Sequence, residues 1–185
     1  NVSIINCEMK ESFYGVYLAM DTDNCQIKNC NIQNNSWGIS FQFSSRNTIE
    51  SNTISNNKEY GMYVGSNSNE NIISDNNIMN NQYAMRIKTS FDNEIIENTV
   101  QNNIYGFYLC CGSENNQIYG NNFLNQLEWH AREENTNSWN NKDMGNYWDT
   151  YSGEDTDNDG VGDTPHYFSQ NIEIADYKPL MNQQE

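Results

Sequence analysis

Short runs in which apolar and polar residues alternate recur along the first three-quarters of the chain. Each run begins at a small residue, at positions 15, 38, 61, 84 and 106, and they read G-V-Y-L, G-I-S-F, G-M-Y-V, A-M-R-I and G-F-Y-L. Because successive side chains of a strand point to opposite faces, this alternation predicts strands with one buried face. The chain is therefore expected to be all-β.

The runs belong to a repeat of nearly constant length. An apolar anchor recurs at intervals of 23, 22, 24, 22 and 23 residues, and an isoleucine stands five positions before each anchor. The anchors are Met9, Ile32, Ile54, Ile78, Val100 and Phe123. This period predicts a parallel β-helix of about six 22–24-residue coils over 1–139, with equivalent residues stacked about 4.8 Å apart.

A bend is expected two residues before each anchor, where asparagine tolerates a left-handed backbone and its amide can bond to the coils above and below. This asparagine ladder comprises Asn52, Asn76, Asn98 and Asn121. Cys7 and Cys30 take the same position in the first two coils, where either a disulfide or two buried thiols would fit. The adjacent Cys110 and Cys111 are expected to point to opposite faces as free thiols.

The polar positions of the alternating runs form rows on the outer face of the predicted sheet. One row contains Tyr17, Tyr63, Arg86 and Tyr108, and the next contains Lys88. Tyrosines beside cations suit the rings and carboxylates of an acidic glycan, while the alternative is aromatic pairing that only stabilises an exposed sheet. Glycoside hydrolysis needs two carboxylates at one site, and the aligned outward positions contain no such pair. A catalytic role is therefore not assigned.

The period ends after Trp139, and residues 140–185 are expected to form an irregular cap. This segment is dense in aromatic residues, which suit the cover that a solenoid needs over its last apolar coil. Coils and cap are predicted to make one structural domain.

An acidic loop, DTDNDGVGD, lies inside the predicted cap. Its acids at positions 1, 3, 5 and 9 and its glycine at position 6 match the first part of a calcium-binding loop. Position 12 is His166 rather than a glutamate, so another acid would have to complete the coordination shell of the calcium ion. Calcium is the expected cofactor, with ligands Asp155, Asp157, Asp159, Asp163 and the carbonyl of Val161.

Composition and charge exclude several classes of function. The chain has 35 asparagines among 185 residues and a net charge of -16, and residues 133–185 hold 12 acids against 2 bases. Such a field opposes binding to nucleic acid. No apolar run approaches the roughly 20 residues that span a bilayer. Five scattered cysteines and two histidines do not predict a zinc or copper site.

The N-x-I-x-x-N-x-I…G repeats and the closing GNYWDTYSGEDTDNDGVGDTP…DYKPL block resemble the NosD-type (CASH) right-handed β-helix proteins, which are abundant on archaeal cell surfaces. The resemblance covers essentially the whole chain. It implies right-handed coils, a calcium-loaded cap and a secreted or surface-anchored protein. It does not imply one activity, because the fold hosts enzymes and scaffolds alike. Copper delivery, the role of one branch, is not expected with two histidines and no Met-His cluster.

Two features bear on location and partners. Asn1 and Asn34 begin N-x-S sequons, which fit an extracellular protein. The repeat register has already begun at Val2, so we expect self-association or further coils upstream of Asn1. The sequence thus predicts an extracellular, cell-surface protein with a structural or adhesive role, as a surface-layer, sheath or filament subunit. The alternative is a polysaccharide-binding module, or a lyase or hydrolase acting on an acidic glycan.

Overall fold

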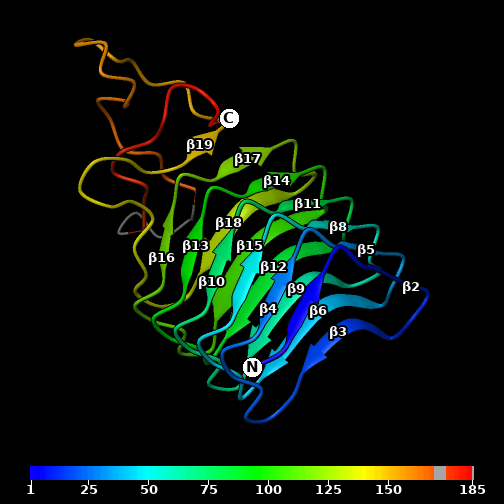
Figure 1. Cartoon of the computed structure of the whole chain (residues 1–185). Helices are drawn as coiled ribbons and strands as arrows, with labels where there is room; N and C mark the ends of the chain where they lie inside the picture. The colour runs from blue at the N-terminus through cyan, green and yellow to red at the C-terminus, as the bar shows by residue number, and fades with distance from the viewer. Residues whose placement is uncertain (169–173, 185) are drawn as a thin grey trace.

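Nineteen short strands wind into a right-handed parallel β-helix (Figure 1) in a computed structural model that describes residues 1–168 and 174–184. The predicted cap, 140–185, extends over the residues outside these ranges. Each coil contributes one strand to each of three parallel sheets, here called A, B and C. The predicted all-β fold and its six coils are confirmed, and the described residues contain no helix that could cross a membrane.

The strands follow one another in strict order around the helix. Sheet A comprises β1 (Ser3–Ile5), β4 (Gln26–Lys28), β7 (Thr48–Glu50), β10 (Ile72–Ser74), β13 (Glu94–Ile96) and β16 (Gln117–Tyr119). Sheet B comprises β2 (Glu8–Lys10), β5 (Asn31–Gln33), β8 (Thr53–Ser55), β11 (Asn77–Met79), β14 (Thr99–Gln101), β17 (Asn122–Leu124) and β19 (Tyr147–Trp148). Sheet C comprises β3 (Tyr14–Leu18), β6 (Trp37–Gln42), β9 (Tyr60–Gly65), β12 (Tyr83–Lys88), β15 (Tyr105–Cys110) and β18 (Trp129–Glu133).

The predicted stacking register is the observed one. The anchors from Met9 to Phe123 pair with one another along sheet B, and the isoleucines from Ile4 to Ile118 do so along sheet A. Most of these side chains are completely buried. The core is therefore a bundle of apolar columns, and hydrophobic burial in each column is the main source of stability.

Polar bends contain three amide ladders rather than the single one expected. In each ladder, the side-chain oxygen of one coil accepts bonds from the backbone N–H and the side-chain amide of the coil before. The first ladder extends the predicted one to Asn146. The second comprises Asn35, Asn57, Asn81, Asn103 and Gln126, and the third Asn47, Asn71, Asn93, Asn116 and Asn137.

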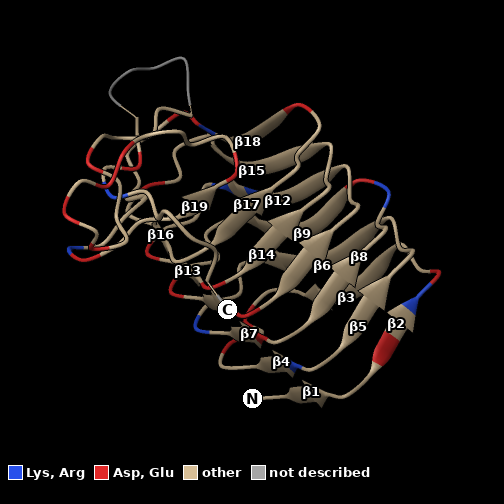
Figure 2. Cartoon of the chain, turned by 90° about the horizontal axis from the view of Figure 1, so that it is seen from above, with Lys and Arg blue, Asp and Glu red and all other residues tan. Residues whose placement is uncertain are grey.

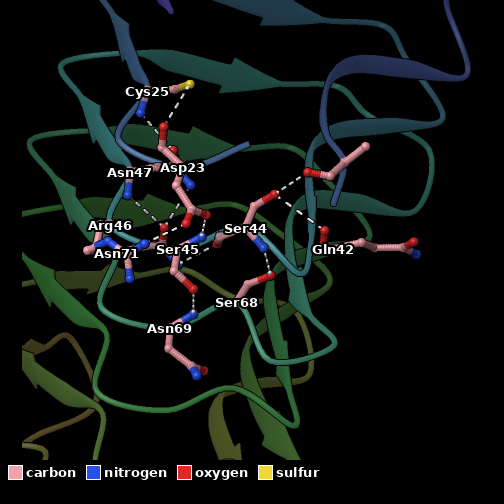
Figure 3. A network of polar contacts seen from close by, with 11 residues as sticks. Asp23, Cys25, Gln42, Ser44, Ser45, Arg46, Asn47, Ser68, Asn69 and Asn71 are labelled. Atoms are coloured by element: carbon pink, nitrogen blue, oxygen red, sulfur yellow. Dashed lines mark hydrogen bonds and ion pairs between the residues drawn. The ribbon is translucent and has the colours of Figure 1, made fainter. Parts of the chain in front are cut away.

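The left-handed residue of each bend is not the ladder asparagine. It is the residue just before, as at Ser51, Asp75 and Glu97, whose φ angles lie between 54° and 57°. This corrects the expectation: the residue before the asparagine makes the turn, and the ladder asparagine donates its backbone N–H to the amide oxygen of the next coil. Figure 3 shows the start of the third ladder, where the Cys25 N–H donates to Asn47 Oδ1 over 2.8 Å and the Asn47 N–H donates to Asn71 Oδ1 over 2.9 Å.

Strand stacking continues past Trp139, where the sequence period ends, because β19 adds a seventh strand to sheet B. Just before Trp139, Ser138 bridges to Gln117 of sheet A. The buried Asp176 carboxylate accepts hydrogen bonds from the Trp148 indole over 2.9 Å and from the Asn146 N–H over 2.6 Å. The irregular C-terminal segment thus packs on a partial seventh coil, above the last full coil in Figure 1.

Candidate functional site

Sheet C carries a continuous column of aromatic side chains on its outer face. Ring centroids of neighbours along the column lie between 4.6 and 5.6 Å apart. We call this column the aromatic ladder, and its members are Tyr14, Trp37, Tyr60, Tyr83, Tyr105 and Trp129. Rings at these distances attract one another, so the ladder presents a fixed, amphipathic surface about six coils long.

The predicted outward row runs beside the aromatic ladder. The register aligns Tyr17, Ser40, Tyr63, Arg86, Tyr108 and Arg132. Arg86 lies 5.2 Å from the Tyr108 ring centroid and donates to the Tyr60 hydroxyl over 3.2 Å, while Lys88 is exposed. Burial raises the pKa of the Tyr63 hydroxyl, so this residue stays neutral. We call the ladder and this row together the aromatic face.

Sequence reasoning missed the aromatic ladder although a signal exists for it. An aromatic residue directly precedes the small residue in all five intact copies. In the sixth coil, Trp129 pairs in register with Tyr105, and His130 stands opposite Gly106. Histidine thus replaces the small residue in that coil.

A cleft of about 580 Å³ opens at the C-terminal end of the aromatic face. Its aromatic walls come from Tyr83, Tyr108, Trp129 and Phe168, and its polar groups are Arg132, Glu133 and Glu134. The Arg132 guanidinium lies 4.9 Å from the Trp129 ring centroid. With aromatic walls and three charged side chains, this concave cleft suits a polar ligand.

Glu133 replaces an apolar residue in an inward column of sheet C. It pairs in register with Leu109, and only 9% of its surface is exposed. Burial raises the pKa of its carboxyl to about 7, although the Trp139 indole N–H donates to it over 2.7 Å. This glutamate is therefore protonated in part of the population at neutral pH.

Two thiols and a carboxylate meet beside the cleft. The Sγ atoms of Cys110 and Cys111 are 2.9 Å apart, and a Glu134 carboxylate oxygen lies within 4.8 Å of both. The Arg86 guanidinium donates to Cys110 Sγ over 3.4 Å. Both cysteines are free thiols, as expected, and Cys110 is buried while Cys111 is exposed. Their sulfurs nevertheless meet, because Cys111 adopts a left-handed φ of 60° that turns its side chain back toward Cys110. The coil corner, rather than strand alternation, decides this geometry.

Other predicted residues lie away from this region. Asp155, Asp157 and Asp159 come within 4.8 Å of one another in the acidic loop, visible among the red segments of the cap in Figure 2. Asp163 turns instead toward Thr156, whose hydroxyl donates to it over 2.7 Å, and Val161 forms a bridge with Leu180.

The structure also locates the predicted cysteine pair and the two sequon asparagines of the first coils. Cys7 and Cys30 occupy stacked positions but are free thiols, with the Cys7 N–H donating to Cys30 Sγ over 3.4 Å. Both sequon asparagines, Asn1 and Asn34, are exposed.

Comparison with known proteins identifies the family. Residues 1–153 match the family model described as "Periplasmic copper-binding protein (NosD)". This chain belongs to the NosD family. A "Probable ABC transporter binding protein NosD" from Stutzerimonas stutzeri is 38% identical over 82 residues, which are 41% of this chain and 19% of that protein. A protein of the same description from Pseudomonas aeruginosa is 35% identical over 79 residues, 41% of this chain and 18% of that protein. The matched segment thus spans less than a fifth of these relatives.

Solved structures show the same fold. The periplasmic alginate epimerase AlgG superposes with a TM-score of 0.67 over 73% of this chain and 37% of its own, at 15% identity. Its T265N mutant gives a TM-score of 0.61 over 73% of this chain and 41% of its own, at 14% identity. At such identities the likeness establishes the right-handed β-helix and nothing about activity.

Family membership corrects the expectation about the cofactor. The NosD family is described as copper-binding, so the expectation of calcium is wrong. The described residues fit a soft copper ion at one place, because Cys110 and Cys111 offer two thiol donors side by side. The two histidines do not join them. His130 pairs with Asp149 over 2.6 Å, and His166 packs against Trp148 with ring centroids 4.9 Å apart.

Family membership also bears on location. The family is described as periplasmic, which agrees with the expected place outside the cytoplasm. Its description does not extend to the cell surface, which stays a prediction.

Proposed function

We propose that this chain is an adhesive β-helix of the cell envelope, exposed at the surface, that binds an acidic polysaccharide along the aromatic face. The observation that carries this proposal is the unbroken aromatic ladder from Tyr14 to Trp129, which ends in a cleft of about 580 Å³. Flat rings on a rigid sheet suit the apolar faces of sugar rings. A chain of sugars lying along the helix axis would contact several rings at once.

Charge favours an acidic glycan over a neutral one. The strands of sheet C contain three bases, Arg86, Lys88 and Arg132, and a single acid, Glu133, which is partly protonated at neutral pH. The chain as a whole has a net charge of -16. Glu134 also lines the cleft, so selectivity rests on the individual bases, whose guanidinium and ammonium groups would pair directly with carboxylates.

Binding of defined sugars tests this proposal. A hexamer of galacturonic acid should bind by titration calorimetry, while cellohexaose should bind at least tenfold more weakly. Trp129→Ala and Tyr63→Ala should each weaken binding about tenfold. Tyr167→Ala is the matched control, because Tyr167 is an exposed tyrosine of the cap, 53% accessible. Equal affinity for the two sugars would contradict the acidic specificity.

A structural role is the other expectation from the sequence, and the same material distinguishes it. A surface-layer, sheath or filament subunit should form large assemblies in sedimentation velocity and show no affinity for either hexamer. That pair of results would overturn the adhesive function.

Copper binding in the envelope is a second candidate function. The family description and the Cys110–Cys111 donor pair support it. Anaerobic titration of the reduced chain with Cu(I) should give a defined stoichiometry. No binding above that of a cysteine-free variant would contradict it.

A further inference from the structure

We propose that Cys110 and Cys111 form a single-ion site for monovalent copper at the corner after β15. This inference rests on the second candidate function and assigns its ligands. The soft thiolate sulfur is the protein donor that Cu(I) prefers. Here the Cys111 thiol donates to Cys110 Sγ over 2.9 Å, and loss of the two protons lets the sulfurs separate around one ion. The other three cysteines of the chain are in the first two coils.

The coil corner brings the two sulfurs into contact. Cys111 takes the left-handed conformation that Phe43, Ser66 and Thr89 take at the same corner of earlier coils. Cys110 is buried while Cys111 is exposed, so an ion would approach through Cys111 and come to rest against Cys110. A Glu134 oxygen accepts from the Cys111 N–H over 3.2 Å, which holds this corner against the next coil.

The local charge suits a monovalent ion. Binding releases the two thiol protons to solvent and leaves two negative sulfurs around one positive ion, with a net charge of -1. The Arg86 guanidinium, 3.4 Å from Cys110 Sγ, offsets this charge.

Competition with a chelator tests the assignment. The chain is reduced with a phosphine and kept anaerobic, because a disulfide between the two cysteines would remove both donors. Cu(I) is then titrated against bicinchoninate. We expect one tightly bound ion per chain, and at least a 100-fold loss of affinity in both Cys110→Ser and Cys111→Ser. The control variant Cys7→Ser, an exposed thiol of the first coil, should bind as the unaltered chain does.

A second measurement needs no variant. Bound Cu(I) should protect Cys110 and Cys111 from alkylation, read by mass spectrometry, and leave Cys7 reactive. Unchanged affinity in both serine variants, or alkylation of the pair in the loaded chain, would overturn this site while copper binding itself stands. Failure of the unaltered chain to take up Cu(I) would overturn both. Neither result bears on the polysaccharide proposal.

Discussion

Trp148 lies flat on Phe123, with ring centroids 4.3 Å apart and planes inclined by 8°. Phe123 ends the anchor column of the last full coil, and Trp148 belongs to β19, which adds to the same sheet. The tryptophan is 1% exposed. The end of the apolar core is thus closed by a ring continuing the column, held by the bond of its indole to Asp176.

Replacing Trp148 tests how much this closure stabilises the chain. We expect Trp148→Ala to lower the free energy of unfolding by about 3–5 kcal/mol, because it leaves a cavity and a buried carboxylate without its indole partner. Urea denaturation measures the change. Tyr167→Ala should be nearly neutral, and an equal loss in the two variants would contradict the closing role of Trp148.

The first amide ladder gives a second prediction. Asn98 donates to the carbonyl oxygens of Ile73 and Ile96 and accepts from the Asn76 backbone N–H, all over 2.9 Å. Asn98→Ala leaves several buried polar groups unpaired, so the free energy of unfolding should fall by about 2–4 kcal/mol. The exposed Gln82→Ala, in a neighbouring coil, is the control. A loss below 1 kcal/mol in thermal unfolding would show that the ladder contributes little.

Glu133 gives a prediction about pH. Its folded-state pKa of about 7 exceeds the ordinary value of 4.5, so the unfolded chain loses this proton first as pH rises. The stability associated with the protonated form is therefore complete below pH 4.5 and declines until the pH passes about 7. Glu133→Gln removes the free-energy cost of ionising a buried carboxyl. The variant should match the unaltered chain at pH 4.5 and exceed it by about 2–3 kcal/mol at pH 8.

Denaturation of both proteins at the two pH values measures this difference. Other titrating groups, such as the half-buried His166, act equally in the two proteins and cancel. A variant whose advantage is the same at both pH values would show that Glu133 does not titrate in this range.

The small residue at the second position of the sheet C strands from β3 to β15 gives a fourth prediction. A Cβ at Gly106 would lie 1.8 Å from the backbone oxygen of His130. Gly106→Ala should therefore force the last two coils apart and cost about 1–3 kcal/mol. Ala84 occupies the same position in an earlier coil, and Ala84→Gly should change stability by less than about 1 kcal/mol. Thermal unfolding compares them, and a neutral Gly106→Ala would mean that the coils adjust freely.

Much of the fold could be predicted from the repeat alone. The anchors, from Met9 to Phe123, and the small positions recur at an interval that only a few architectures share. Each coil contacts chiefly its two neighbours, so the spacing along the chain translates directly into stacking. The two further amide ladders and the aromatic ladder follow the same spacing, so the sequence contains a signal for them as well.

The candidate site depended on contacts that no local pattern specifies. The strand rule placed Cys110 and Cys111 on opposite faces, and the left-handed corner brought them together. Glu134 joins them from the next coil, more than twenty residues away in sequence. The cleft forms only where the coils meet Phe168 of the cap.

The sequence by itself determined the solenoid, its register and the apolar columns, because these follow from short-range periodicity and the burial of alternate side chains. The tertiary structure decided how the last coil is closed, why a glutamate is buried at its end and where thiols and carboxylate converge. Those features depend on turn geometry and on packing between segments without a common period, and neither is encoded in the spacing of residues along the chain.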